Sequence, residues 1–374
     1  MKNILVGNGI NIQYDKVNCA PKNIVLRMLL SFDDEDFPCD YIVDDPMLLK
    51  NYIGKLFLAA REAIDGEFDK YTNCTAERKG LDDFKQRYAD KKKSLRITDI
   101  GFEDYYLIHD LLCHKSHIYN PEQFTIRESL RMAYLHSIYN HGKLNLLYKQ
   151  FDKGLIEFLN SFDNIFTTNY DNNLESVTEK EIYHIHGQFD KFSETYNPNS
   201  FRNTLSDNAI EGIPNEPQYQ YLHSTALSTY CGDYKKYQIK QSILANEAIE
   251  KMANGYQTMD SVKQDIDSWK YSNNQLVVNL GEAIKLKVAN PDLQFQEDYC
   301  IKEFQSITGE LVILGLSPYN DYHLFEMIDS ALLANCIFYY YDESECKRIS
   351  LLLPKTKEEE RLLFKNVKDF WEEI

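Results

Sequence analysis

Two kinds of apolar pattern follow one another along this chain of 374 residues. Short β-prone runs, at 2–6, 165–166, 182–185 and 311–314, stop abruptly at glycine, threonine or histidine. Such runs are typical of parallel strands that are buried on both faces of a sheet. Between them, longer stretches repeat apolar side chains at helical spacing. The pattern therefore predicts an α/β fold, a Rossmann-like and mainly parallel sheet with large helical insertions.

The same pattern sets the expected boundaries of one domain over residues 1–374. We expect the sheet core at about 1–32, 150–190 and 308–345, helical insertions at about 45–145 and 190–305, and a C-terminal helix at 355–374. In the last part of the core, a strand, a glycine turn, a helix capped by Asp321 and a second strand predict one right-handed βαβ unit. Residues 189–218, rich in Asn, Ser and Pro, predict a long irregular segment.

Two strand ends lie close together in the central stretch 164–187. The first runs from an apolar entry into Thr168, Asn169 and Asp171, and the second ends at His186 and Gly187. The carboxyl ends of parallel strands lie at one edge of a sheet, where open α/β folds bind ligands. We therefore expect Asn169, Asp171 and His186 to converge on one pocket.

Two glycine turns follow other predicted strands, Gly7-Asn8-Gly9-Ile10-Asn11 near the start and Gly315-Leu316-Ser317 late in the chain. Glycine lets the backbone approach a ligand, so such a turn can present N–H groups to a phosphate or a ribose. Only half of the dinucleotide fingerprint is present at the first turn, because Ile12 stands where the third glycine would be. An ordinary β-turn therefore remains open as the alternative.

Composition narrows the possible partners. Hydrophobic residues make up 43% of the chain, which indicates a globular protein, and the net charge of −17 argues against a broad nucleic-acid footprint. The lysines of 89–96 predict a solvated charged face. No apolar run approaches the ~20 residues that a membrane helix needs. We therefore expect a cytoplasmic protein that contacts neither membrane nor nucleic acid directly.

Metal chemistry has little support in the sequence. The eight cysteines include no Cys-x-x-Cys pair, which predicts reduced, mostly buried thiols and no zinc ribbon. The stretch 109–117 contains three histidines and a cysteine, but its spacing fits no standard zinc pattern. It is better interpreted as a helix end with solvated histidines, and we expect no metal.

Taken together, Gly7-Asn8-Gly9, Thr168-Asn169-Tyr170-Asp171, His184-Ile185-His186-Gly187 and Gly315-Leu316-Ser317 resemble the sirtuin-like family, specifically its bacterial antiphage-defence branch. The resemblance covers about a third of the chain. The opening Val-Gly-Asn-Gly also resembles abortive-infection proteins of the AbiH type. Either resemblance implies a role in phage defence.

The sirtuin-like resemblance implies a set of site residues with NAD as the substrate. Asn169, Asp171 and His186 would be the catalytic group, and the cofactor contacts would be Gly7, Asn8, Gly9, Asn11, Thr168, Gly187, Gly315 and Ser317. In chemical terms Asp171 suits a developing positive charge or the ribose hydroxyls, and Asn169 suits orientation of water or the carboxamide. His186 suits proton acceptance, and His184 lies on the same strand face but matches no motif position.

The chain lacks two features of the sirtuin-like family, and their absence bears on which of the family's activities to expect. The chain lacks both the Gly-Ile-Pro-x-Phe-Arg continuation after the first turn and the four-cysteine zinc module of the deacylases. This favours NAD hydrolysis to nicotinamide and ADP-ribose over protein deacylation. A non-catalytic module that binds NAD or ADP-ribose remains the alternative. The resemblance also implies regulation by a homo-oligomer or by a HerA-like DNA-translocase ATPase.

Overall fold

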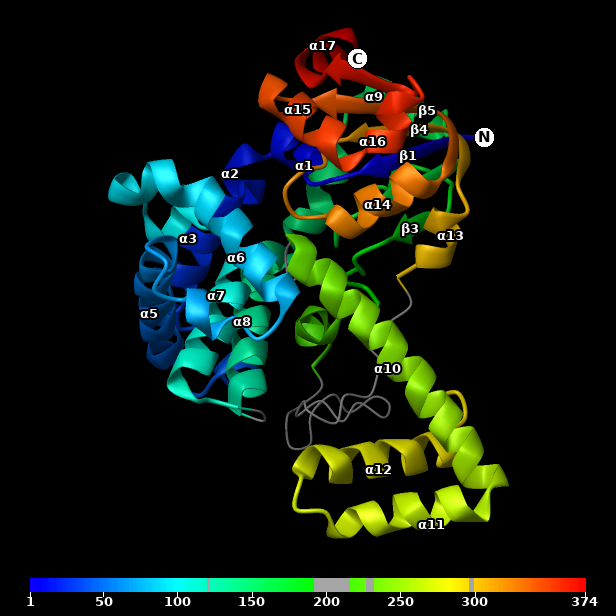
Figure 1. Ribbon diagram of the computed structural model, residues 1–374. Helices are drawn as coiled ribbons and strands as arrows, with labels where there is room; N and C mark the ends of the chain where they lie inside the picture. Colours follow the sequence, from blue (N-terminus) through cyan, green and yellow to red (C-terminus); the bar gives the residue numbers. More distant parts are fainter. Residues whose placement is uncertain (120–121, 192–215, 227–231, 296–298) are drawn as a thin grey trace.

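Six parallel strands form one sheet in the computed structural model, which describes residues 1–119, 122–191, 216–226, 232–295 and 299–374. The strands lie in the order β3-β2-β1-β4-β5-β6 (Figure 1). Their bounds are β1 (Lys2–Val6), β2 (Asn164–Thr167), β3 (Ile182–His184), β4 (Thr308–Leu314), β5 (Leu332–Tyr340) and β6 (Leu362–Asn366). The chain thus starts in the middle of the sheet, builds one side and then the other, which is the Rossmann arrangement. The predicted fold class is confirmed.

The centre of the sheet is buried on both faces. In the register, Leu5 pairs with Phe166 of β2 and with Ile313 of β4. Ile4 and Val6 point into the core cluster that includes α9 (Lys153–Asn160) and α17 (Val367–Glu373). Leu5 and Phe166 point into the cluster that includes α13 (Ile301–Gln305) and α14 (Tyr322–Ser330). Helices therefore cover both faces, which explains why these strands read as continuous apolar runs.

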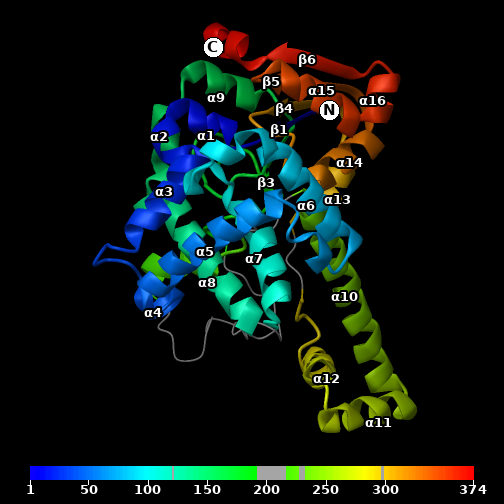
Figure 2. The same cartoon turned by 60° about the vertical axis from the view of Figure 1, so that its left-hand side comes forward.

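The first insertion is helical, as its pattern predicts. From the first strand to the second, the helices and turns are α1 (Gly9–Tyr14), α2 (Lys16–Cys19), α3 (Pro21–Ser31), α4 (Cys39–Ile42), α5 (Pro46–Ile64), η1 (Asp69–Tyr71), α6 (Thr75–Tyr88), η2 (Ala89–Ser94), η3 (Ile97–Asp99), α7 (Phe102–Ser116), α8 (Glu122–Tyr139), η4 (Asn140–Gly142), η5 (Leu144–Gln150) and α9 (Lys153–Asn160). Helices α3 and α5 to α8 form a helical subdomain beside the sheet (Figures 1 and 2).

The expectation of solvated histidines at a helix end is wrong for His109. It lies in the middle of α7 and is fully buried, with ring nitrogens in contact with the Tyr52 hydroxyl at 2.8 Å and the Gln123 carbonyl at 3.0 Å. Helix α7 is buried along most of its length within the helical subdomain, so a polar ring on it is covered by neighbouring helices. His117, at the end of α7, is exposed as expected.

A long helix leads the second insertion away from the sheet. The elements are η6 (Pro217–His223), α10 (Gly232–Thr258), α11 (Asp260–Ser268), η7 (Trp269–Tyr271), α12 (Gln275–Ala289) and α13 (Ile301–Gln305). Helix α10 begins beside the sheet, and its far half packs with α11 and α12 into an arm (Figures 1 and 2) with a small core of its own. Most of the irregular segment expected at 189–218 lies outside the described residues.

The prediction of one C-terminal helix at 355–374 is wrong, because this stretch contains a strand between two short helices. The structure has α14 (Tyr322–Ser330), α15 (Glu343–Leu352), α16 (Pro354–Glu358), the sixth strand β6 and α17 (Val367–Glu373). Strand β6 pairs in parallel with β5, and Leu362 and Phe364 pack on the sheet core while Leu363 is exposed. The alternation of more and less buried residues in β6 extends over only five residues, and the charged residues on either side have helical spacing, so the sequence pattern did not indicate a strand.

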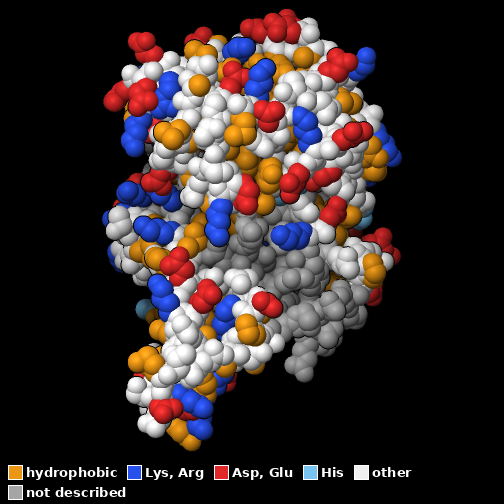
Figure 3. Space-filling model, turned by 90° about the vertical axis from the view of Figure 1, so that its right-hand side faces the viewer, with side chains coloured by type: hydrophobic (Ala, Val, Ile, Leu, Met, Phe, Trp, Pro, Cys, Tyr) orange, Lys and Arg blue, Asp and Glu red, His pale blue; other side chains and the backbone are white. Residues whose placement is uncertain are grey.

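Charged side chains of both signs lie on the described surface (Figure 3). Figure 3 shows Lys and Arg interspersed with Asp and Glu over one face. The lysine-rich η2 is exposed as predicted. No helix within the described ranges is long and apolar enough to span a bilayer. The seven described cysteines are free, as predicted, but only Cys19, Cys113 and Cys336 are buried, fewer than expected.

Candidate active site at the switch point of the sheet

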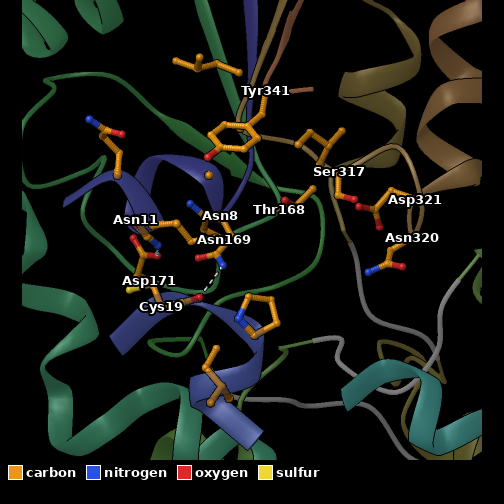
Figure 4. A pocket seen from close by; sticks show the side chains of 18 of the residues that line it. Asn8, Asn11, Cys19, Thr168, Asn169, Asp171, Ser317, Asn320, Asp321 and Tyr341 are labelled. Carbon is orange, nitrogen blue, oxygen red and sulfur yellow. Dashed lines mark hydrogen bonds between the residues drawn. The ribbon is translucent and has the colours of Figure 1, made fainter. Parts of the chain in front are cut away.

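A pocket of about 690 Å³ opens at the carboxyl ends of β1 and β4, from which the chain continues to strands on opposite sides of the sheet. This is the point at which the strand order reverses, where Rossmann-like sheets bind ligands. It is lined by Asn8, Gly9 and Asn11 after β1, Thr168 to Asp171 after β2, His186 after β3, Gly315 to Ser317 after β4, and Tyr341 after β5. Asn8, Asn11, Asn169 and Asp171 gather on one side of it, and Ser317, Asn320 and Asp321 lie on the other (Figure 4).

The structure brings together all the residues that the sequence nominates except two. Asn169, Asp171 and His186 line the pocket, as do Asn8, Gly9, Asn11, Thr168, Gly315 and Ser317. Gly7 and Gly187 do not line it. At Gly187 a Cβ atom would lie 2.1 Å from the Thr225 carbonyl oxygen, and the residue has φ +76°. Gly187 therefore serves the packing of the turn after β3 rather than contact with a ligand.

The two glycine turns are pressed against each other. A Cβ at Gly7 would lie 2.4 Å from the Gly315 oxygen, and one at Gly9 would lie 2.5 Å from the Gly315 Cα. The Gly9 N–H donates to the Gly315 carbonyl at 2.8 Å, so this donor is engaged within the protein. The glycines are thus required first by contact between the turns, which closes the pocket floor across the switch point.

Asp171 is held on both carboxylate oxygens. Asn11 Nδ2 donates to one oxygen at 2.7 Å, and the backbone N–H and side-chain amide of Asn173 donate to the other at 3.1 and 2.6 Å. Burial raises the pKa of Asp171, and these hydrogen bonds oppose the rise. The carboxylate therefore orients Asn11 at the pocket wall.

Asn169 is fixed through its backbone and its amide nitrogen. Its N–H donates to Thr167 Oγ1 at 3.0 Å, and its Nδ2 donates to the Gly7 carbonyl at 3.4 Å. His184 Nδ1 contacts the Asn169 carbonyl at 2.9 Å while His184 Nε2 contacts Glu175 at 2.6 Å. Burial lowers the pKa of His184, but the Glu175 carboxylate, the Asn169 carbonyl and the Asp171 charge together outweigh burial, so the net shift of this pKa is upward. His184 thus supports Asn169 from behind, and the Asn169 side-chain oxygen has no partner among the described residues.

His186 lies in a buried ionisable cluster that the sequence did not reveal. Its Nε2 is 3.2 Å from His323 Nε2 and 3.6 Å from Asp321 Oδ1. Lys235 from α10 places its ammonium 3.4 Å from the same Asp321 oxygen and 3.1 Å from Glu103 Oε1. Lys235, Asp321 and Glu103 belong to the pocket lining as well.

Burial and the Lys235 ammonium set the protonation of this cluster. The pKa of His186 is lowered well below its usual value by burial and by Lys235 and His323, so the imidazole is neutral at neutral pH. Burial raises the pKa of Glu103 to about 7, although Lys235 opposes the rise. The pKa of Asp321 is raised by burial too, again against the effect of Lys235.

Sequence reasoning placed Asp321 differently and missed its neighbours. Asp321 occupies the N-cap position of α14, but its side chain makes no cap hydrogen bond and turns to Lys235 instead. His323 follows Asp321 by two residues, so its closeness in sequence to the late glycine turn could have marked it as a second polar group near the pocket. Glu103 and Lys235 come from the two insertions, so no local pattern could connect them with the sheet edge.

His186, Asp321 and His323 also have the residue types of a metal site, with donor atoms within 4.8 Å of one another. The ammonium of Lys235 already contacts the only carboxylate of this set. A divalent cation would therefore meet a fixed positive charge at Asp321.

The fold and the pocket define a Rossmann-like α/β protein with a pocket at the switch point of its sheet. Comparisons of the chain with protein families, with curated proteins and with solved structures find no significant match.

Proposed function

We propose that this protein is an NAD hydrolase that cleaves the nicotinamide glycosidic bond to give nicotinamide and ADP-ribose. The observation that carries the proposal is the meeting of Asn169 and His186 with the two glycine turns in one pocket. Its volume of about 690 Å³ falls within the range of about 300–1,000 Å³ typical of small-molecule sites.

The reaction asks little acid catalysis of the protein. The nicotinamide ring of NAD is already a cationic pyridinium, so it takes the glycosidic electron pair and leaves as neutral nicotinamide without being protonated. The protein therefore needs to stabilise an oxocarbenium-like transition state and to position a water molecule. In our proposal neutral His186 accepts a proton from the attacking water or from a ribose hydroxyl. The Asn169 side-chain oxygen orients that water, and Asp171 keeps Asn11 directed at the ligand.

The test is release of free nicotinamide from NAD by the purified protein, with Asn169→Ala and His186→Ala as variants. Loss of a positioned base costs roughly 10²–10⁴ in rate, so His186→Ala is expected near background while NAD binding survives. Exposed His117→Asn is the matched histidine control, because Asn tolerates the positive φ of 56° found there. Wild-type turnover by His186→Ala would contradict the assignment of the base.

A non-catalytic module that binds NAD or ADP-ribose is the second candidate. The full engagement of both Asp171 oxygens by internal donors favours it, because that carboxylate then meets the ligand only through Asn11. Wild-type protein that binds NAD but releases no nicotinamide, alone or with a partner, would establish this reading. The absence of a four-cysteine module still disfavours deacylation.

The biological setting is proposed on the resemblance alone. A cytoplasmic enzyme of this kind would deplete NAD in infected cells and so abort phage infection, under control of a homo-oligomer or a HerA-like ATPase. We expect light scattering of the purified protein to show an assembly larger than one chain, or one formed on addition of the ATPase. A strict monomer with full NAD turnover in isolation would contradict this regulation.

A further inference from the structure

Two buried imidazoles meet at the pocket wall, and only one of them lines the pocket. His186 and His323 approach through Nε2 atoms at 3.2 Å, with ring centroids 5.3 Å apart. Two ring nitrogens at this distance are held together when one carries a proton and the other does not. The pair therefore fixes a tautomer on each ring.

We propose that His323 is a positioning residue that holds His186 with its proton on Nε2, leaving Nδ1 as the nitrogen that accepts a proton in the reaction. This inference rests on the proposed NAD hydrolysis for its catalytic meaning, but the tautomer itself is a property of the protein alone.

The surrounding charges decide which ring donates. Asp321 Oδ1 lies 3.6 Å from His186 Nε2, too far for a hydrogen bond but close enough for its charge to favour a proton there. A donor atom of His323 lies within 4.8 Å of Asp321 as well, but of the two described rings only His186 comes within 4.0 Å of this carboxylate. Since Nε2 of His186 faces His323, Nδ1 is the nitrogen left for a ligand in the pocket.

Further contacts from ionic and apolar side chains hold this arrangement in place. Lys235 is 1% exposed and links Asp321 to Glu103, so the carboxylate beside His186 cannot turn into the helix cap it would otherwise make. Asp321 and His323 both belong to the start of α14, which is fixed by apolar packing of Leu324 and Phe325 on the sheet. His323 therefore contacts His186 from a rigid element.

The proton balance of the step is simple. As the water oxygen bonds to C1′ of the ribose, the glycosidic electron pair leaves with nicotinamide and the water proton passes to His186 Nδ1. His186 is then an imidazolium whose Nε2–H is donated to His323. His323 gains no proton, and His186 returns its own to solvent after product release.

The tautomer can be measured without NAD. In protein labelled with ¹⁵N-histidine, long-range ¹H–¹⁵N correlation spectra identify which ring nitrogen carries the proton, and the His186 signals are assigned by their loss in His186→Ala. We expect the Nε2–H form in wild type and a mixture of tautomers in His323→Phe. Wild-type His186 found with its proton on Nδ1 would overturn the proposal, whatever the enzyme activity.

Kinetics give the second readout. His323→Phe is expected to lower kcat by roughly ten- to a hundredfold with KM nearly unchanged, which is the size of effect found for groups that orient metal-binding histidines. His323→Gln, whose amide oxygen can accept the Nε2–H bond, should recover part of kcat together with the wild-type tautomer. Unchanged kcat in His323→Phe would overturn the proposal. If no variant and no wild type cleaves NAD while the tautomer follows His323, the proposed function fails and the positioning of His186 stands.

The same spectra separate this reading from a metal site. Stoichiometric zinc in the purified protein, lost in both His323→Phe and Asp321→Asn, would overturn the tautomer proposal, because both Nε2 atoms would then be ligands. We expect no such zinc, since the Lys235 ammonium already contacts the only carboxylate of this set and would repel a divalent cation.

Discussion

At the scale of single residues, the candidate site depends on positions that touch no ligand. Gly315 has φ +74°, and a Cβ there would lie 2.9 Å from Ile10 N and 3.0 Å from Gly9 Cα. These neighbours are backbone atoms of the facing turn, which cannot move aside as a flexible side chain can. The glycine that the sequence suggested as a ligand contact is therefore also a structural requirement of the pocket floor.

Replacing Gly315 by alanine should destabilise the protein through backbone strain, whereas replacing an uncrowded helical glycine should stabilise it through helix propensity. We expect Gly315→Ala to lower the free energy of unfolding by about 1–3 kcal/mol, because a non-glycine residue is forced into the left-handed region against backbone atoms. Gly54→Ala is the matched control: nothing lies within 4 Å of its Cβ position inside α5, so this change should stabilise by about 0.5–1 kcal/mol. Chemical denaturation of both variants checks the pair, and equal effects would contradict the turn contact.

At the scale of elements, local pattern predicted those parts of the fold whose signal is local. The strands at 2–6 and 311–314 are buried on both faces, so their continuous apolar runs identified them. Strand β6 was missed because its short alternation lies on a sheet edge between charged segments. The burial of His109 was missed for a related reason, since burial depends on which helices surround α7.

The candidate site divides in the same way. Asn169, Asp171 and His186 follow strands that are adjacent in the sheet, so strand ends alone could bring them together. Lys235 and Glu103 reach the pocket from separate insertions, 132 residues apart in the chain. Only the tertiary fold joins them, and burial together with the Lys235 ammonium then keeps His186 neutral.

At the scale of the whole molecule, the hydrophobic core of the described residues is divided among three clusters. Two of them lie on opposite faces of the sheet, and the third belongs to the arm formed by α11, α12 and the far half of α10. The arm cluster has few fully covered members, namely Ile249, Ala253, Ile266, Ala283, Ile284 and Leu293, and it shares none with the clusters at the sheet. Since Lys235 lies at the near end of α10, one helix spans both the pocket and the arm.

A molecule built in this way should open in parts rather than all at once. We expect amide hydrogens of α11 and α12 to exchange with solvent through local unfolding, at opening free energies well below those of β1 and β4, whose core side chains are almost completely buried. The near end of α10 provides the internal control, because it packs against α6 and α14 and should be protected like the sheet. Hydrogen exchange followed by mass spectrometry measures all three segments in one experiment. Equal protection of α11 and β1 would show that the arm and the sheet unfold as one cooperative unit, contrary to the division of the core.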